Sequence, residues 1–270
     1  MSCSLVGSEM CIRDSNRGDR KMSNIKQEFG ARINPVSINI ETLEYLNQFV
    51  AENNITSVLE FGSGVSTEFW SEKVPNAKII SFDNSRRYAK ITRSRLHQNA
   101  TDATVRFAPL RRMKIFGTHY IGCKFLPYLH KHAPTKPFDV MLIDGPPGYL
   151  YAREATLLQA YPYIDENTLI IVDDAERDVE RNTIKRWAEM FEMSDLQFHD
   201  MGAKQIATFK IKPNPQKDTM TKSAVHTRKN MIKLLLTFYK RNTMHNLWLL
   251  KMRLLNREPF PDQKMNQESK

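Results

Sequence analysis

Short apolar runs alternate with stretches of helical periodicity between residues 37 and 212. The runs at 58–61, 78–83, 138–144 and 168–173 each have the length of a buried strand. Leu43, Leu46, Phe49 and Val50 recur at helical spacing before Asn53-Asn54 ends the pattern. Because alternating strands and helices build a parallel sheet covered on both faces, the pattern predicts a doubly wound α/β domain.

The remaining segments complete this prediction. We expect a basic helix over 86–99, a strand over 103–108 and an irregular, basic and aromatic segment over 110–137. A helix over 149–161 follows, and the next helix carries Ile184, Trp187, Ala188 and Phe191 on one face. The last two strands, 196–200 and 205–211, form a hairpin. The predicted sheet is therefore Rossmann-like, seven-stranded and mostly parallel, with a terminal antiparallel hairpin.

The chain divides into three predicted regions: an N-terminal extension (1–36), the α/β domain (37–212) and a C-terminal extension (213–270). Residues 1–15 carry no core pattern and resemble translated sequencing-adapter sequence, which would make them an artefact, so they do not enter the predicted fold. They lack the apolar stretch of a secretory signal, and no run approaches the roughly 20 apolar residues of a membrane-spanning helix. Three scattered cysteines favour neither a disulfide framework nor a zinc site. We therefore expect a cytoplasmic protein.

Positive charge is concentrated in the C-terminal extension. Residues 217–258 contain ten Lys or Arg and two acids, which accounts for +8 of the chain's net charge of +10. Leucines, Phe238 and Trp248 are interleaved with these cations, so we expect one or two basic amphipathic helices over 221–255. Such a segment could contact an anionic membrane surface, pack within the chain or in a homodimer, or, less favoured, bind nucleic acid.

A glycine turn follows the first predicted strand. Gly62 and Gly64 let backbone amides approach a ligand at the carboxyl edge of the sheet. The dinucleotide fingerprint needs a third glycine where this chain has Thr67, which disfavours NAD. Asp83, at the end of the second strand, is placed to accept both hydroxyls of a ribose.

Three segments together resemble the class I S-adenosylmethionine-dependent methyltransferases: residues 58–64 (VLEFGSG), 80–83 (ISFD) and 138–144 (FDVMLID). Residues 202–207 (GAKQIA) are similar to the last hairpin of that family. The resemblance implies that Gly62, Ser63 and Gly64 border the methionine and ribose of the cofactor. It also implies that Glu60 supports the amino-acid end of the cofactor and that Asp83 binds the ribose.

Asp144 ends the fourth predicted strand, and Asp173 and Asp174 end the fifth. Because neighbouring parallel strands lie about 5 Å apart, these carboxylates should converge at the ligand-binding edge. Like charges this close need a proton or a cation between them, and an all-oxygen set suits Mg²⁺ or another divalent cation. The arrangement is similar to that of metal-dependent catechol-type O-methyltransferases. The alternative is that Asp173 and Asp174 cap the following helix.

The general base has several candidates, because Pro147 stands where the catechol-type enzymes have a catalytic lysine. The candidates are Asp144, Tyr149, Tyr151 and His119. Arg153 and Arg177 could clamp an anionic acceptor, or pair with acids such as Glu154 or Asp178. Aromatic and basic side chains of 110–137 suit a sugar or ring acceptor beside the cofactor crevice.

These observations predict metal-assisted O-methylation of a small hydroxylated or sugar acceptor by S-adenosylmethionine. Two alternatives remain open: N-methylation of nucleic acid or protein, and a cofactor-binding scaffold without turnover.

Overall fold

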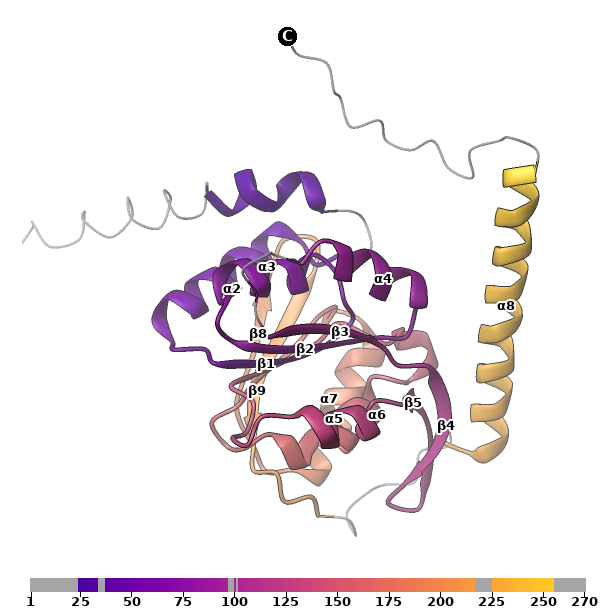
Figure 1. Ribbon diagram of the computed structural model, residues 1–270. Helices are drawn as coiled ribbons and strands as arrows, with labels where there is room; N and C mark the ends of the chain where they lie inside the picture. The colour runs from indigo at the N-terminus through magenta and orange to yellow at the C-terminus, as the bar shows by residue number, and fades with distance from the viewer. Residues whose placement is uncertain (1–23, 34–36, 97–99, 101, 217–224, 255–270) are drawn as a thin grey trace, which may run out of the picture.

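A seven-stranded sheet forms the centre of the computed structural model, which describes residues 24–33, 37–96, 100, 102–216 and 225–254 (Figure 1). Its strand order is β3-β2-β1-β6-β7-β9-β8. The strands are β1 (Ser57–Phe61), β2 (Lys78–Asp83), β3 (Ala103–Phe107), β6 (Val140–Ile143), β7 (Leu169–Val172), β8 (Met193–Asp200) and β9 (Gln205–Ile211). The first five are parallel, and β9 runs antiparallel to both β7 and β8. The predicted fold class is thereby confirmed.

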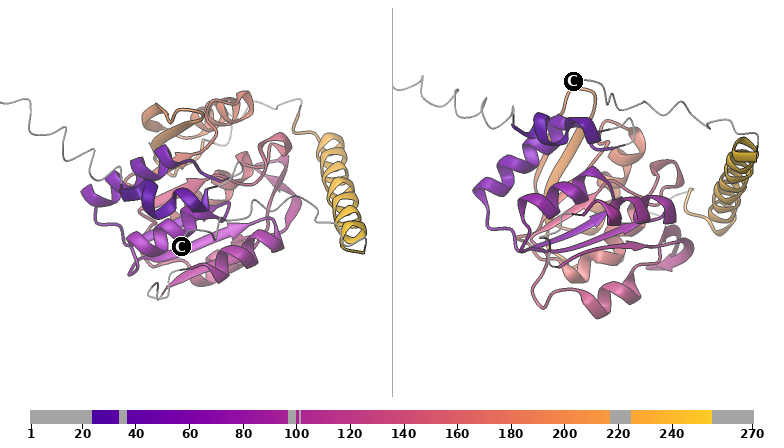
Figure 2. Two further views of the ribbon diagram at one scale, coloured as in Figure 1. Left: turned by 90° about the horizontal axis from the view of Figure 1, so that it is seen from above. Right: turned by 45° about the horizontal axis from the view of Figure 1, so that its top comes forward.

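Helices cover both faces of the sheet (Figures 1 and 2). One layer contains α2 (Ile40–Glu52), α3 (Val65–Lys73) and α4 (Arg86–Ser94), and the other contains α5 (Leu126–His132), α6 (Glu154–Ala160) and α7 (Asp178–Met190). The described segments also include the short 3₁₀ turns η1 (Gly30–Arg32), η2 (Gly148–Leu150) and η3 (Tyr161–Tyr163). Because helices lie on both sides, β1 and β6 are buried along their whole length, which explains the continuous apolar sequence of β6, whereas β1 also buries Ser57 and Glu60.

Each helical layer has its own apolar core. Trp187 of α7 packs near Phe209 of β9 on one side, while Phe69 and Trp70 of α3 are fully buried on the other. Residues 24–29 are helical, and Ile25 and Phe29 belong to the second core. This segment lies within the predicted N-terminal extension, yet it packs against α3. Residues 1–15 lie outside the described part of the chain.

The prediction of an irregular segment over 110–137 was wrong. The segment contains a separate hairpin, β4 (Leu110–Ile115) with β5 (Thr118–Cys123), followed by α5. Phe116 and Gly117 make the two-residue turn, with φ of 47° and 82°. Left-handed conformations at both positions match the twist of a hairpin, and Gly117 was the signal that sequence reasoning missed.

Two helix predictions also needed correction. The helix expected over 149–161 is interrupted, because Tyr151 adopts a left-handed conformation (φ 52°) between η2 and α6. In α7 the inward face contains Thr183, Ile184, Trp187 and Met190, whereas Ala188 is exposed.

Within its described residues, the C-terminal extension contains one long helix, α8 (Arg228–Leu254), which stands beside the β4–β5 hairpin (Figure 2). Met231 and Phe238 are buried in the core, and the Tyr239 hydroxyl donates a 2.9 Å hydrogen bond to the Leu110 carbonyl. Packing within the chain, one of the alternatives for this segment, is therefore confirmed for its first half. Residues 217–224 and 255–258 of the basic segment lie outside the described residues. Within the described chain, we find no helix that combines the length and apolarity needed to cross a bilayer.

Candidate functional site

A cavity of about 1070 Å³ opens at the carboxyl ends of β1, β2 and β6. Its lining residues from these strand ends are Gly62, Ser63, Gly64, Asp83, Asn84, Asp144 and Gly145. Helix α8 closes one side with Phe238, Tyr239, Asn242 and Thr243. The volume lies at the upper end of small-molecule pockets, so it can accept more than one ligand. The topology thus brings most of the predicted site residues to one cavity.

The glycine turn after β1 depends on two close approaches. Gly62 has φ of +99°, and a Cβ there would lie 2.9 Å from the Gly145 backbone nitrogen. Gly145, in the loop after β6, meets Gly62 from the other side: a Cβ on it would lie 3.0 Å from the Gly62 Cα. Gly64 faces open space, and a Cβ on it would meet no described atom within 4 Å. The turn therefore exposes backbone to the cavity where a side chain would fill it.

Asp83 lies beside this turn at the end of β2. Its Oδ2 accepts hydrogen bonds from the Ser63 amide (3.1 Å) and hydroxyl (2.8 Å), and its Oδ1 accepts one from the Ser85 amide (2.6 Å). The side chain is nearly buried, yet it lines the cavity. Burial raises the pKa of Asp83, while the donors from Ser85 and Ser63 oppose that rise. These contacts fix the carboxylate in one orientation.

Glu60 is placed differently from the expectation drawn from the family. It is fully buried under the turn and is not among the residues that line the cavity. Its Oε2 accepts a 2.6 Å hydrogen bond from Ser81 and another from the Thr67 hydroxyl, which in turn accepts one from the Gly64 amide (3.0 Å). Burial raises the pKa of Glu60 to about 7. In this structure Glu60 therefore supports the glycine turn from below.

The three predicted carboxylates converge: one oxygen from each of Asp144, Asp173 and Asp174 lies within 4.8 Å of the others. Asp174 has φ of 60°, a left-handed conformation that Asp tolerates better than most residues. Burial and the neighbouring charge of Asp173 raise the pKa of Asp144 well above its usual range. Convergence of the acids is confirmed, and it creates the like-charge repulsion that the sequence predicted.

Arg153 of the turn before α6 relieves much of this repulsion. Its guanidinium is 2.9 Å from Asp174 Oδ2, 3.6 Å from Asp144 Oδ1 and 3.4 Å from Glu180 Oε1. It also donates to the backbone carbonyls of Asp144 (2.7 Å), Pro146 (3.1 Å) and Asp173 (2.7 Å). The residue is 4% exposed. Arg153 is therefore a fixed internal cation, and its partners are not Glu154.

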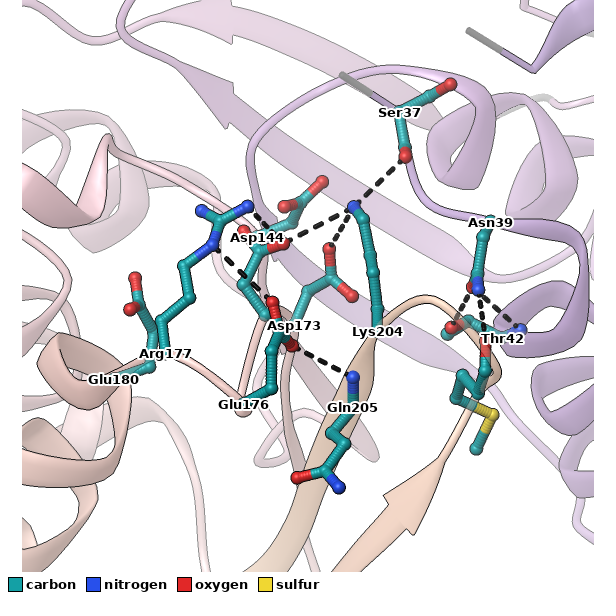
Figure 3. Close-up of polar contacts among 12 residues, drawn as sticks. Ser37, Asn39, Thr42, Asp144, Asp173, Glu176, Arg177, Glu180, Lys204 and Gln205 are labelled. Atoms are coloured by element: carbon teal, nitrogen blue, oxygen red, sulfur yellow. Dashed lines mark hydrogen bonds and ion pairs between the residues drawn. The ribbon is translucent and has the colours of Figure 1, made fainter. Parts of the chain in front are cut away.

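Lys204 supplies a second cation from the turn between β8 and β9 (Figure 3). Its Nζ lies 3.2 Å from Asp173 Oδ2 and 3.4 Å from Asp174 Oδ1, and donates to the Ser37 carbonyl at 3.2 Å. Arg177, which is about half exposed, lies 2.8 Å from Asp174 Oδ1 at the rim. The sequence shows Lys204 only as part of a hairpin motif, because nothing local connects it to acids 31 residues earlier.

The capping alternative for Asp173 and Asp174 was wrong. Helix α7 begins at Asp178, its N-cap is Arg177, and no side-chain cap hydrogen bond is formed there. Both aspartates instead face Lys204 and the other cluster members.

The remaining candidates divide between the cavity and its surroundings. Tyr149 lines the cavity and faces Arg241 of α8, whose guanidinium lies 6.0 Å from the ring centre. His119 lies on β5 and Tyr151 contacts His226, and neither is among the lining residues. Of the predicted acceptor segment 110–137, Leu110 reaches the cavity wall. On that side the wall is built largely by α8.

No family model matches the chain, and no curated protein matches it at significance. Several solved structures are similar. Cofactor-bound Rv0187 from MTB aligns with a TM-score of 0.50 and 16% identity over 76% of this chain and 94% of its own.

Two others are named as O-methyltransferases. One is the Bacillus cereus enzyme in complex with SAH (TM-score 0.49, 16% identity, 75% of this chain and 94% of that one). The other is TomG from Streptomyces achromogenes, in complex with SAM (TM-score 0.48, 14% identity, 75% and 92%). At these identities the likeness concerns the fold, and the alignment with Rv0187 supports it.

Proposed function

We propose that the protein is an S-adenosylmethionine-dependent methyltransferase that O-methylates a small hydroxylated acceptor, such as a sugar. The observation that carries the proposal is the joint placement of the Gly62–Gly64 turn and Asp83 on one cavity at the carboxyl edge of the sheet. Ligands of doubly wound sheets bind at this edge, and an acid at the end of the second strand suits a ribose.

The residues present fit this cofactor. Gly64 leaves open space at the turn, and Asp83 presents a carboxylate whose position is fixed by Ser63 and Ser85. Gly62, Ser63, Gly64 and Asp83 would hold the amino-acid and ribose portions, with Glu60 holding the turn from below. When bound, the cofactor supplies an electrophilic methyl group on a sulfonium.

The acceptor would occupy the part of the cavity between Asp144 and α8. Asp144 lines this part and is the strongest of the predicted base candidates, because Tyr149 lies at the exposed rim and neither His119 nor Tyr151 lines the cavity. In this proposal Asp144 accepts the hydroxyl proton of the acceptor. Positioning supplies most of the remaining rate, since methyl transfer needs the acceptor oxygen held in line with the methyl group.

Metal assistance does not fit the cluster as it stands. The buried Asp173 Oδ1 has no hydrogen-bond partner among the described residues, which alone would favour a bound cation. However, Arg153 and Lys204 already lie 2.9–3.6 Å from one oxygen of Asp144, one oxygen of Asp173 and both oxygens of Asp174. The proposed function therefore includes no metal-dependent step.

Calorimetric titration with S-adenosylmethionine tests the cofactor assignment. Asp83→Ala should weaken binding roughly 100-fold, as expected for two lost hydrogen bonds to a charged acceptor. Asp102→Ala is the matched control, because Asp102 is an exposed acid that pairs with Lys78 away from the cavity. Unchanged affinity in Asp83→Ala would contradict the assignment.

Methyl transfer from radiolabelled S-adenosylmethionine distinguishes the proposed O-methylation from the two alternatives, which are N-methylation of nucleic acid or protein and a cofactor-binding scaffold without turnover. Methyl incorporation into monosaccharides and nucleotide sugars, but not into RNA or histone-like protein, is the expected result. Incorporation into RNA or protein would favour the N-methyltransferase, and tight cofactor binding without incorporation across an extended acceptor panel would favour the scaffold.

Peripheral membrane contact and homodimerisation through α8 stay predictions. Ile232, Leu236, Met244 and Leu247 are exposed on this helix near Lys229, Lys233 and Lys240. The full chain should sediment with phosphatidylserine vesicles, whereas the chain truncated after residue 216 should stay in the supernatant. Equal sedimentation of the two would exclude a role for this region in membrane contact.

A further inference from the structure

We infer that Lys204, together with Arg153, holds the position that a divalent cation would take at the Asp144–Asp173–Asp174 cluster, so the site operates without bound metal. The role that this gives Lys204 in methyl transfer refines the proposed function and rests on it. The structural claim, that two side-chain cations replace one metal ion, can be tested without any turnover.

Charge supports the inference first. The cluster and its nearest acid, Glu180, contribute at most four negative charges. Three positive charges offset them through six contacts of 2.8–3.6 Å, and these charges belong to Arg153, Lys204 and Arg177. At most one negative charge is left over, which is less than the charge of a divalent ion. Adding such an ion would bring two or three fixed cations within direct repulsion of it.

The geometry distinguishes the two main cations. Arg153 is 4% exposed and tied to three backbone carbonyls, so it cannot leave when a metal approaches. Lys204 is attached by a flexible stem and reaches the cluster from the β8–β9 turn, so it could be displaced or removed. Its Nζ bridges Asp173, Asp174 and the Ser37 carbonyl (Figure 3). The Lys204 ammonium therefore occupies a part of the cluster that a divalent metal ion could take if Lys204 were removed.

Lys204 also has a positional role in the proposed reaction. It lines the cavity alongside Asp144 and Asp174. Two of the three N–H groups of the ammonium are donated to Ser37 and Asp173, so the third can be donated to the acceptor oxygen and orient it toward Asp144, the task that a metal performs in metal-dependent enzymes. Lys204 is thus assigned as a positioning residue for the acceptor.

The test is a Mn²⁺ titration of the full chain, in which electron paramagnetic resonance measures the concentration of free Mn²⁺. The wild-type protein should show no Mn²⁺ binding that depends on Asp173. Lys204→Met should gain a site at least tenfold tighter than any wild-type site, and the double change Lys204→Met with Asp173→Asn should lose it. Lys212→Met is the matched control, because Lys212 pairs with Glu192 on the surface and should leave Mn²⁺ binding unchanged.

Lys204→Gln provides a second variant with a polar side chain in case Lys204→Met does not fold, which circular dichroism would reveal. Wild-type Mn²⁺ binding that Asp173→Asn abolishes would overturn the inference and restore the metal site. Failure of both folded Lys204 variants to gain Mn²⁺ binding would overturn the assignment to Lys204. Cofactor calorimetry on the same samples reports separately on the proposed function, so the two failures are distinguishable.

Discussion

The two ends of the cavity are built in different ways. At the cofactor end, Asp83 is held by Ser63 and Ser85, and the glycine turn is held by Thr67 and Glu60, all within 26 residues of the chain. At the carboxylate end, Asp173 is held by Lys204, 31 residues away, and Arg153 joins the ends of β6 and β7. The first end depends on backbone shape, and the second depends on balanced buried charge.

The difference predicts which changes each end tolerates. A backbone site fails when a side chain is added, because there is no space or no permitted φ for it. A charge-balanced site fails when a side chain is removed, because a buried charge loses its partner.

The largest expected effect is at the carboxylate end. Arg153→Met leaves Asp144, Asp174 and Glu180 without their shared cation, so the free energy of unfolding should fall by about 3–5 kcal/mol at neutral pH. Arg177→Met is the control, since its half-exposed pair with Asp174 should contribute less than about 1 kcal/mol. Urea unfolding followed by circular dichroism measures both. Equal losses in the two variants would show that burial of the pair does not matter.

The next effect is at the cofactor end. Gly62→Ala combines a left-handed φ with a Cβ 2.9 Å from the Gly145 nitrogen, so it should destabilise the protein by roughly 3 kcal/mol and abolish cofactor binding. Gly117→Ala has the same φ problem without a described neighbour within 4 Å, and should cost only about 1 kcal/mol. The comparison isolates the close approach of the two loops. A Gly62→Ala protein that binds cofactor normally would contradict it.

A smaller and pH-dependent effect comes from Glu60. Its pKa is raised by burial from 4.5 to about 7, so between these pH values the folded protein holds a proton that the unfolded chain releases. This contribution to stability is complete below pH 4.5 and is lost as the pH rises through 7, by at most about 3 kcal/mol. Glu60→Gln does not titrate, so its unfolding free energy should vary less over this window. An identical slope for both proteins would rule Glu60 out as the source.

The same contrast, between contacts made locally and contacts made between distant segments, explains which features could be predicted from the sequence. The parallel strands, the terminal antiparallel hairpin and the residues of the glycine turn follow from patterns within a few dozen residues, and Asp83 and Asp144 were found because strand ends are readable from apolar runs. Lys204 and α8 were missed as parts of the site because their contacts are made only after the β8–β9 hairpin and the C-terminal helix pack against distant segments.

The β4–β5 hairpin was missed because its alternation is weak: Arg111, Arg112 and Lys114 are exposed on an isolated two-stranded sheet. The capping alternative for Asp173 and Asp174 was wrong because Asp174 adopts a left-handed conformation before α7 starts.

The most direct test of the central claim is a crystal structure of the full chain with S-adenosylhomocysteine. The account predicts the ribose hydroxyls within hydrogen-bond distance of the Asp83 carboxylate and the amino-acid end against the Gly62–Gly64 turn. Ligand density elsewhere in the molecule, with Asp83 still bonded only to Ser63 and Ser85, would contradict it.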